Sequence, residues 1–222
     1  MFRAIAYKEW LKIRWVWLIL LVLSLAVAAR MLLSLQQALA FRSPIVIWTL
    51  TVFQGYQYYG SLRYLPLAIG LAIGAAQFIP EVLSRRLTLS LHLPLRENRA
   101  ILWMLAVGFL AASALVVATA ALVVAIGFWY FPREIVVSAL LNMAPWILAG
   151  CAGYFGLAAL LVEPRWLQKA LLLLMTAGFI DLLMEHVNNR AYTPLLPVLL
   201  VLAAGLSLAI VLSVRRFRRG VQ

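Results

Sequence analysis

Long apolar runs, separated by shorter polar stretches, dominate the sequence. Most of these runs approach or exceed the roughly 20 residues that an α-helix, rising about 1.5 Å per residue, needs to cross the hydrocarbon core of a bilayer. The pattern therefore predicts an all-α polytopic membrane protein with six transmembrane helices. Their expected ranges are about 15–35, 60–79, 100–130, 135–162, 170–184 and 194–214.

A mixed segment, residues 36–61, lies between the first two predicted helices. It carries Gln36, Arg42 and Pro44 together with several aromatic residues. Counting 44–60 as a further crossing would give seven helices and would place the two basic chain ends on opposite sides of the membrane. We therefore interpret the segment as an outer-face stretch that leads into the second helix.

Residues 1–14 mix charged and apolar side chains and end at a tryptophan-rich junction. The charged residues there include Lys8, Glu9, Lys12 and Arg14. This pattern is typical of a short helix lying in the membrane interface, and it predicts such a helix leading into the first crossing. No A-x-A-like site follows the first apolar run, so we interpret that run as a retained helix and not as a cleaved signal peptide.

The composition agrees with a membrane domain. Of the 222 residues, 66% are apolar and 12% are charged, whereas soluble globular chains usually contain about 45–50% apolar residues. A soluble fold of this length cannot bury so large an apolar fraction. We therefore expect residues 1–222 to form a single transmembrane domain.

The basic residues determine the predicted topology. The chain has nineteen Lys and Arg residues and seven Asp and Glu residues. Because the basic residues cluster at the ends of apolar runs, membrane orientation explains this excess better than nucleic-acid binding does. With six helices, fourteen of the nineteen lie on the side of the two chain ends and of the 80–99 loop. The positive-inside rule then predicts that both termini and this loop are cytoplasmic.

The 80–99 loop is the longest polar interruption between the predicted helices. Its leucines alternate with serine, threonine and arginine, and Leu93-Pro94 would end any helix. A short amphipathic helix here would leave Arg85 and Arg86 available for acidic groups of a partner. An ordinary positive-inside loop is the alternative, and composition alone favours it.

The sequence contains no common nucleotide-binding or hydrolase motif. G-x-x-x-x-G-K-[ST], H-E-x-x-H and G-x-S-x-G are all absent. The single cysteine, Cys151, excludes an internal disulfide and a multi-cysteine metal site. We expect no metal or cofactor to be bound by this chain, no enzymatic activity of its own, and an energy source on another chain if the protein does work.

The loop combines an acidic residue, a basic stretch with a threonine, a leucine-rich run and Leu-Pro followed by further arginines. The residues of this pattern are Glu81, Arg85, Arg86, Thr88, Leu89, Leu91, Leu93, Pro94, Arg96 and Arg99. The pattern resembles the coupling region of type-2 ABC exporter permeases, and Lys8-Glu9-Trp10-Leu11-Lys12-Ile13-Arg14 is similar to that family's cytoplasmic lead-in helix. The resemblance covers the six-helix layout, its specific motif is confined to about twenty residues, and Leu87 stands where the family often has glycine.

This resemblance implies a function and a set of partners. The loop would insert into a groove of a separate ATPase subunit, which binds ATP and Mg. Two ATPases would act on two permease subunits, as a homodimer or a heterodimer, in the cytoplasmic (inner) membrane of a bacterium. The chain would be the permease subunit of an ATP-driven exporter, and its substrate is left open among lipid, glycan, peptide and drug.

Three charged residues are expected inside or near the membrane. Arg30 and Asp181 lie at similar depths in the first and fifth predicted helices, which makes a pair between them geometrically reasonable; the alternative is that Arg30 extends outward to the membrane interface. Glu185 follows Asp181 by one helical turn. A membrane-embedded enzyme that uses Asp181, Glu185 and His186 is an alternative function, and a non-catalytic scaffold is another. Metal binding by these three is disfavoured because one helical turn rarely supplies three ligands.

Small and aromatic residues predict how the helices pack. Gly70 and Gly74 form a G-x-x-x-G surface, and residues 149–156 are rich in Gly and Ala, which favours close helix packing within the chain over a subunit interface. Pro66 is expected to kink the second helix. Tryptophans near the helix ends, Trp15, Trp48, Trp129 and Trp166, are interpreted as membrane-interface anchors.

Overall fold

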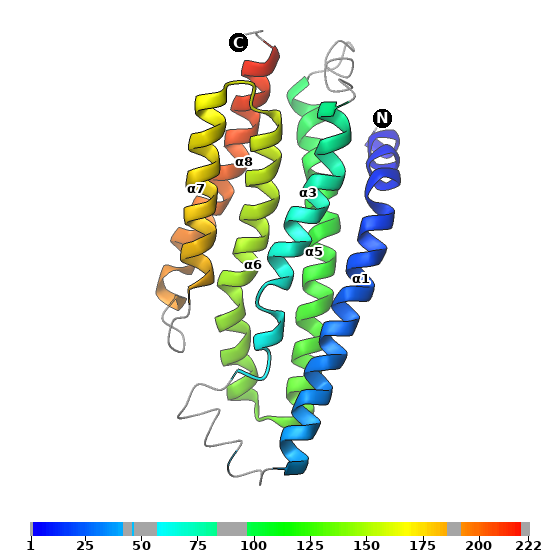
Figure 1. Cartoon of the computed structure of the whole chain (residues 1–222), viewed down its shortest axis with the longest axis vertical. Coiled ribbons are helices and arrows are strands. Elements are labelled where there is room, and N and C mark those ends of the chain that lie inside the picture. Colours follow the sequence, from blue (N-terminus) through cyan, green and yellow to red (C-terminus); the bar gives the residue numbers. More distant parts are fainter. Residues whose placement is uncertain (1, 42–45, 47–56, 84–96, 186–191, 219–222) are drawn as a thin grey trace.

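The computed structural model describes residues 2–41, 46, 57–83, 97–185 and 192–218, and within these ranges the chain is helical and forms no β-strand (Figure 1). The helices run along a common long axis. In chain order, the elements are α1 (Phe2–Phe41), the 3-10 turn η1 (Gly60–Leu62), α3 (Leu65–Leu83), α5 (Glu97–Tyr130), α6 (Arg133–Val162), α7 (Trp166–Met184), the 3-10 turn η2 (Thr193–Leu195) and α8 (Leu196–Arg218).

Five of the described helical segments are long and apolar enough to cross a membrane. A further apolar section, Thr193–Leu208, lies in η2 and α8 and is shorter. The structure therefore confirms an all-α chain with five or six helices able to span a bilayer, which is the architecture of a multi-pass membrane protein. The five segments are Ile5–Phe41, Gly60–Leu83, Leu102–Tyr130, Arg133–Val162 and Trp166–Met184.

Both chain ends lie at the same end of the bundle. There α1 begins, α3 ends, α5 begins and α8 ends (Figure 1), and we call this the terminal end. An even number of crossings produces this arrangement. That the terminal end faces the cytoplasm stays a prediction from the charge distribution.

The N-terminal segment is not a separate helix. Helix α1 continues without interruption from Phe2 to Phe41 over 40 residues, which corresponds to about 60 Å at 1.5 Å per residue. No Pro or Gly occurs within this range, so nothing in the sequence breaks the helix at the junction of Arg14 and Trp15. The expected interfacial helix is the first part of α1, and a helix of this length extends beyond a hydrocarbon core of about 30 Å.

The two prolines of α3 do not act as the sequence suggested. Pro66 is the second residue of the helix, where its missing N–H would have had no partner, so it starts the helix and does not kink it. Pro80 lies inside the last turns, and the helix continues past it to Leu83. Because the helix does not stop at residue 79 as expected, Glu81 belongs to α3 and not to the loop.

Close contact between α3 and α6 forms the centre of the bundle. A Cβ atom placed on Gly70 would collide with the carbonyl oxygen of Gly150, and one on Gly150 would lie 2.5 Å from the carbonyl oxygen of Pro66. Gly74 also faces α6, but a Cβ atom there would lie 3.4 Å from the carbonyl oxygen of Tyr154, which is close to an ordinary contact. The glycines therefore let the two backbones touch within one chain, which confirms the expected intrachain packing.

Aromatic side chains fill the end of the bundle opposite the terminal end. Tyr58 stacks on Phe131 with a centroid distance of 4.9 Å, and Tyr59 contacts Trp146 at 5.7 Å. By contrast, Trp15, Trp129 and Trp166 are 64%, 84% and 82% exposed, as membrane-interface anchors should be. The fourth predicted anchor, Trp48, lies outside the described residues.

Candidate functional site

A cluster of buried charged and polar side chains lies near the terminal end, between α1 and α3. Glu9 of α1 and Glu81 of α3 are both fully buried, which is rare for carboxylates unless they are paired. Helical spacing brings the members together, because residues three or four apart share a face. Lys8, Glu9 and Lys12 thus face α3, and Gln77 and Glu81 face α1. We call these five residues the polar cluster.

Two lysines neutralise the two buried carboxylates. The Lys12 ammonium donates to Glu9 Oε1 at 2.7 Å and also to Glu81 Oε1, while Lys8 Nζ lies 2.9 Å from the same Glu81 oxygen. The Lys12 side chain is only 13% exposed, whereas that of Lys8 is 44% exposed. Lys12 is therefore the central cation, and Lys8 is the partner that solvent screens.

Gln77 connects the charges to the interior of the bundle. Its amide nitrogen donates to Glu9 Oε2 at 3.0 Å and to the carbonyl oxygen of Met104 in α5 at 2.7 Å. Its amide oxygen accepts a hydrogen bond from the Tyr154 hydroxyl of α6 at 2.8 Å. One continuous hydrogen-bonded chain thus runs from α1 through α3 to α5 and α6.

A glycine on α5 makes room for this connection. A Cβ atom on Gly108 would collide with both the Gln77 amide oxygen and the Tyr154 hydroxyl. Gln77, Gly108 and Tyr154 were not singled out from the sequence. The available signal was a glutamine one turn before Glu81 in an otherwise apolar run, which places two polar side chains on one face of α3.

The structure brings together two elements that the sequence treated separately. Lys8 and Lys12 of the predicted lead-in helix contact Glu81, the first predicted coupling residue, and Lys12 also contacts Glu9. Arg14 is exposed, with its guanidinium 5.4 Å from the ring centroid of Trp15. The remaining coupling residues lie outside the residues whose placement is described: Arg85, Arg86, Thr88, Leu89, Leu91, Leu93, Pro94 and Arg96; the side chain of Arg99 is also not described.

Arg30 and Asp181 do not pair within a single chain. Both side chains are exposed, and neither forms an ion pair with a described residue. Helix α1 lies at one edge of the bundle and α7 at the other, with α3, α5 and α6 between them (Figure 1). Similar depth along two helices therefore did not make them neighbours.

The two described residues of the alternative enzymatic site are not recessed. Asp181 and Glu185 are both exposed on α7 and at its end, and His186 lies outside the described residues. Within the described part of the chain, no group of three potential metal ligands occurs. The clustered ionisable residues of the structure are those of the polar cluster, where lysines neutralise the carboxylates and hold helices together.

Removing the Tyr154 hydroxyl should test the inner part of this hydrogen-bonded chain. The Tyr154→Phe substitution leaves the ring in place and leaves the buried Gln77 amide oxygen without its donor, so we expect a loss of about 1 kcal/mol in the free energy of unfolding. Unfolding of the purified protein in detergent measures the change. Tyr64→Phe is the matched control because Tyr64 is 63% exposed, and it should change little. Equal effects of the two substitutions would contradict the role given to Tyr154.

Comparison with known proteins adds no relative: no family model, no curated protein and no solved structure matches the chain.

Proposed function

We propose that the chain is the permease subunit of an ATP-driven exporter and that a separate ATPase subunit drives it through the 80–99 loop. The observation that carries this proposal is the contact of Lys8 and Lys12 with Glu81. It joins the first turns of α1 to the last turn of α3, directly before the basic stretch that resembles a coupling loop. A stable contact between helices is needed where a force applied to a short loop must move whole helices.

The polar cluster gives that force a route into the membrane domain. A displacement of the end of α3 would pull on α1 through Lys12 and on α6 through Gln77 and Tyr154. Charge-assisted hydrogen bonds between buried groups are stronger than neutral ones, so these helices would move together. Coupling of this kind needs no catalytic group in the chain itself, since ATP and Mg would be bound by the ATPase.

The proposed complex follows from the same resemblance. Two ATPase subunits would require two docking loops, so the active unit would contain two permease chains. The terminal end would face the cytoplasm, and the fourteen basic residues assigned to that side support this orientation. We place the protein in the bacterial cytoplasmic membrane on the basis of that family resemblance.

Reversing the charge of the loop tests the proposal. We expect the double variant Arg85→Glu/Arg86→Glu to bind its ATPase at least about tenfold more weakly, because like charges replace complementary ones at the contact. The neighbouring reading frames are first searched for a soluble ATPase with a phosphate loop. The measurement is then copurification with that ATPase, followed by ATP-dependent transport in vesicles. Arg133→Glu is the control, since Arg133 is exposed at the start of α6, at the opposite end of the bundle.

Two results would count against the exporter proposal. One is full ATPase association and transport by the double variant. The other is activity of the isolated chain without ATP that is lost when Asp181 is replaced by Asn, which would favour the embedded enzyme. A scaffold would show no nucleotide dependence in any of these assays.

A further inference from the structure

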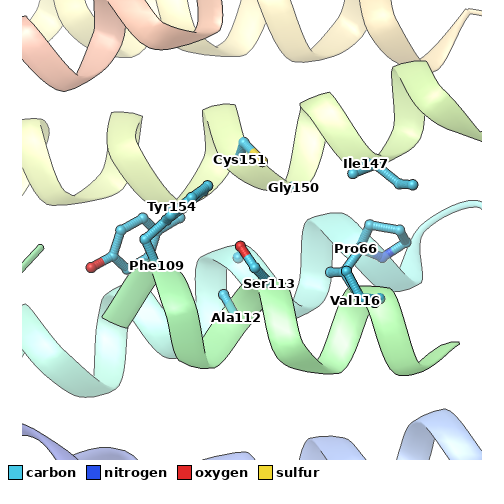
Figure 2. Close-up of a pocket in the computed structure, with 11 residues that line it drawn as sticks. Pro66, Phe109, Ala112, Ser113, Val116, Ile147, Gly150, Cys151 and Tyr154 are labelled. Atoms are coloured by element: carbon cyan, nitrogen blue, oxygen red, sulfur yellow. The ribbon is translucent and has the colours of Figure 1, made fainter. Parts of the chain in front are cut away.

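A cavity of about 210 Å³ lies between the first turns of α3 and the middle parts of α5 and α6 (Figure 2). Phe109 and Tyr154 stand at one end of it, and Pro66, Val116 and Ile147 stand at the other. Between them, the lining consists of small side chains and glycine backbone. The cavity does not include the charged residues of the polar cluster.

The helix crossing described above explains why the space exists. Gly70 and Gly150 bring α3 and α6 into backbone contact, so neither helix offers a side chain at this point. Helix α5 faces the crossing with Ala112 and Ser113, which are too small to fill the gap. Replacing Ala112 or Ser113 by a large residue would fill the cavity from α5, so its volume depends on residue choice at a few positions.

The lining selects for hydrocarbon. Among the described residues, no charged side chain contributes to it, and its polar side-chain groups are the Ser113 hydroxyl, the Cys151 thiol and the Tyr154 hydroxyl. The Tyr154 hydroxyl is already bonded to Gln77. Water needs two to four polar partners to remain in a cavity, and apolar cavities stay dry or take up apolar molecules. A charged or strongly polar ligand would find no counterpart here.

The cavity opens toward the membrane. It is partly open, and Val117 at its rim is 66% exposed. Val117 lies near the centre of the span Leu102–Tyr130, so the opening faces the depth at which acyl chains surround the protein. The volume is smaller than the roughly 300–1,000 Å³ of pockets that enclose drug-sized ligands, so it suits part of a chain and not a whole large molecule.

From these observations we propose that the cavity is a binding site for the end of an unbranched acyl chain, which enters sideways from the bilayer between α5 and α6. Apolar burial supplies the affinity, at about 0.8 kcal/mol per buried CH₂ group. The head group of the occupant stays outside the cavity, at the membrane interface. This inference does not depend on the exporter proposal, since it concerns only the shape and chemistry of the cavity.

Photolabelling tests the proposal directly. The full chain is reconstituted in phosphatidylcholine vesicles that contain a phosphatidylcholine with a diazirine near the end of one acyl chain, and crosslinked peptides are mapped after irradiation. We expect labels on the stretches around Phe109 to Val117 and Ile147 to Tyr154. The Ser113→Phe variant should lower labelling of these stretches about tenfold, which corresponds to about 1.4 kcal/mol.

The neighbouring residue provides the matched control. Ala114 is exposed and does not line the cavity, so Ala114→Phe adds the same side chain on the lipid-facing surface and should leave labelling unchanged. If Ser113→Phe does not yield folded protein, Cys151→Leu fills the cavity from α6 with a smaller change in volume. The proposal is overturned if labels on these stretches are no denser than elsewhere, or if cavity-filling variants label like the parent protein.

A second probe distinguishes the source of the chain. A fatty acid with the same diazirine carries one acyl chain and a small head group. Labelling by both probes indicates that the site accepts any acyl chain, whereas labelling by the phospholipid alone indicates a resident membrane lipid, and labelling by the fatty acid alone indicates a single-chain ligand. If neither probe labels the cavity, the acyl-chain proposal is wrong. That result would not affect the exporter proposal, which the ATPase experiment tests separately.

Discussion

Replacing Lys12 by Met should lower the free energy of unfolding by about 3 kcal/mol, the lower end of the range for breaking a buried ion pair by removing one partner. Lys12 contacts both buried carboxylates, and its side chain is 13% exposed. Without it, Glu81 keeps Lys8 as a counter-ion, whereas the partner that Glu9 retains among the described residues is the amide of Gln77. Chemical unfolding of the purified protein in detergent measures the loss.

Two further variants separate this explanation from a general loss of packing. Lys8→Met removes a lysine that is 44% exposed, and it should cost less than about 1 kcal/mol. Combining Lys12→Met with Glu9→Gln removes the uncompensated charge and should recover at least half of the loss, because the neutral amide can still accept from Gln77. Similar losses for Lys8→Met and Lys12→Met, or no recovery in the double variant, would contradict the charge argument.

The locations of most helices follow from local features of the sequence. Pro132 directly precedes α6, and Pro164 lies just before α7, so both boundaries were predictable within a few residues. The expected boundary between an interfacial helix and the first crossing was wrong for the opposite reason. Charges at Lys8, Lys12 and Arg14 suggested a change of environment, but without Gly or Pro the helix continues regardless of polarity.

The candidate site was predictable only in part. The sequence singled out Lys8, Glu9, Lys12 and Glu81 as candidate site residues. It did not predict that Lys12 and Glu81, which are 69 positions apart, form a contact. That contact depends on how α1 and α3 pack, and packing is determined by side chains distributed over several helices. The same limitation applies to Arg30 and Asp181, since equal depth in two helices does not determine which helices are adjacent.

Replacing Gly70 by Leu should lower the free energy of unfolding about as much as Lys12→Met does, but through packing instead of charge. A Cβ atom alone at this position would collide with the Gly150 carbonyl oxygen, so any side chain forces α3 and α6 apart. Overpacking a closely packed contact costs about 1–3 kcal/mol, and a rigid backbone obstacle places this variant at or above the upper limit. Gln77 lies on α3 and Tyr154 on α6, so separating the two helices should also break the hydrogen bond between these residues.

Gly178→Leu is the matched control for this variant. Gly178 lies in the middle part of α7, and a Cβ atom there meets nothing within 4 Å, so the leucine would point into the surrounding lipid. Leucine also has the higher helix propensity, which makes a neutral or slightly stabilising result the expected one. Unfolding in detergent should therefore separate the two variants by about 3 kcal/mol. If Gly70→Leu unfolds at the same denaturant concentration as Gly178→Leu, then α3 and α6 are not held in backbone contact, and the explanation given for both the acyl-chain cavity and the linkage to Tyr154 fails.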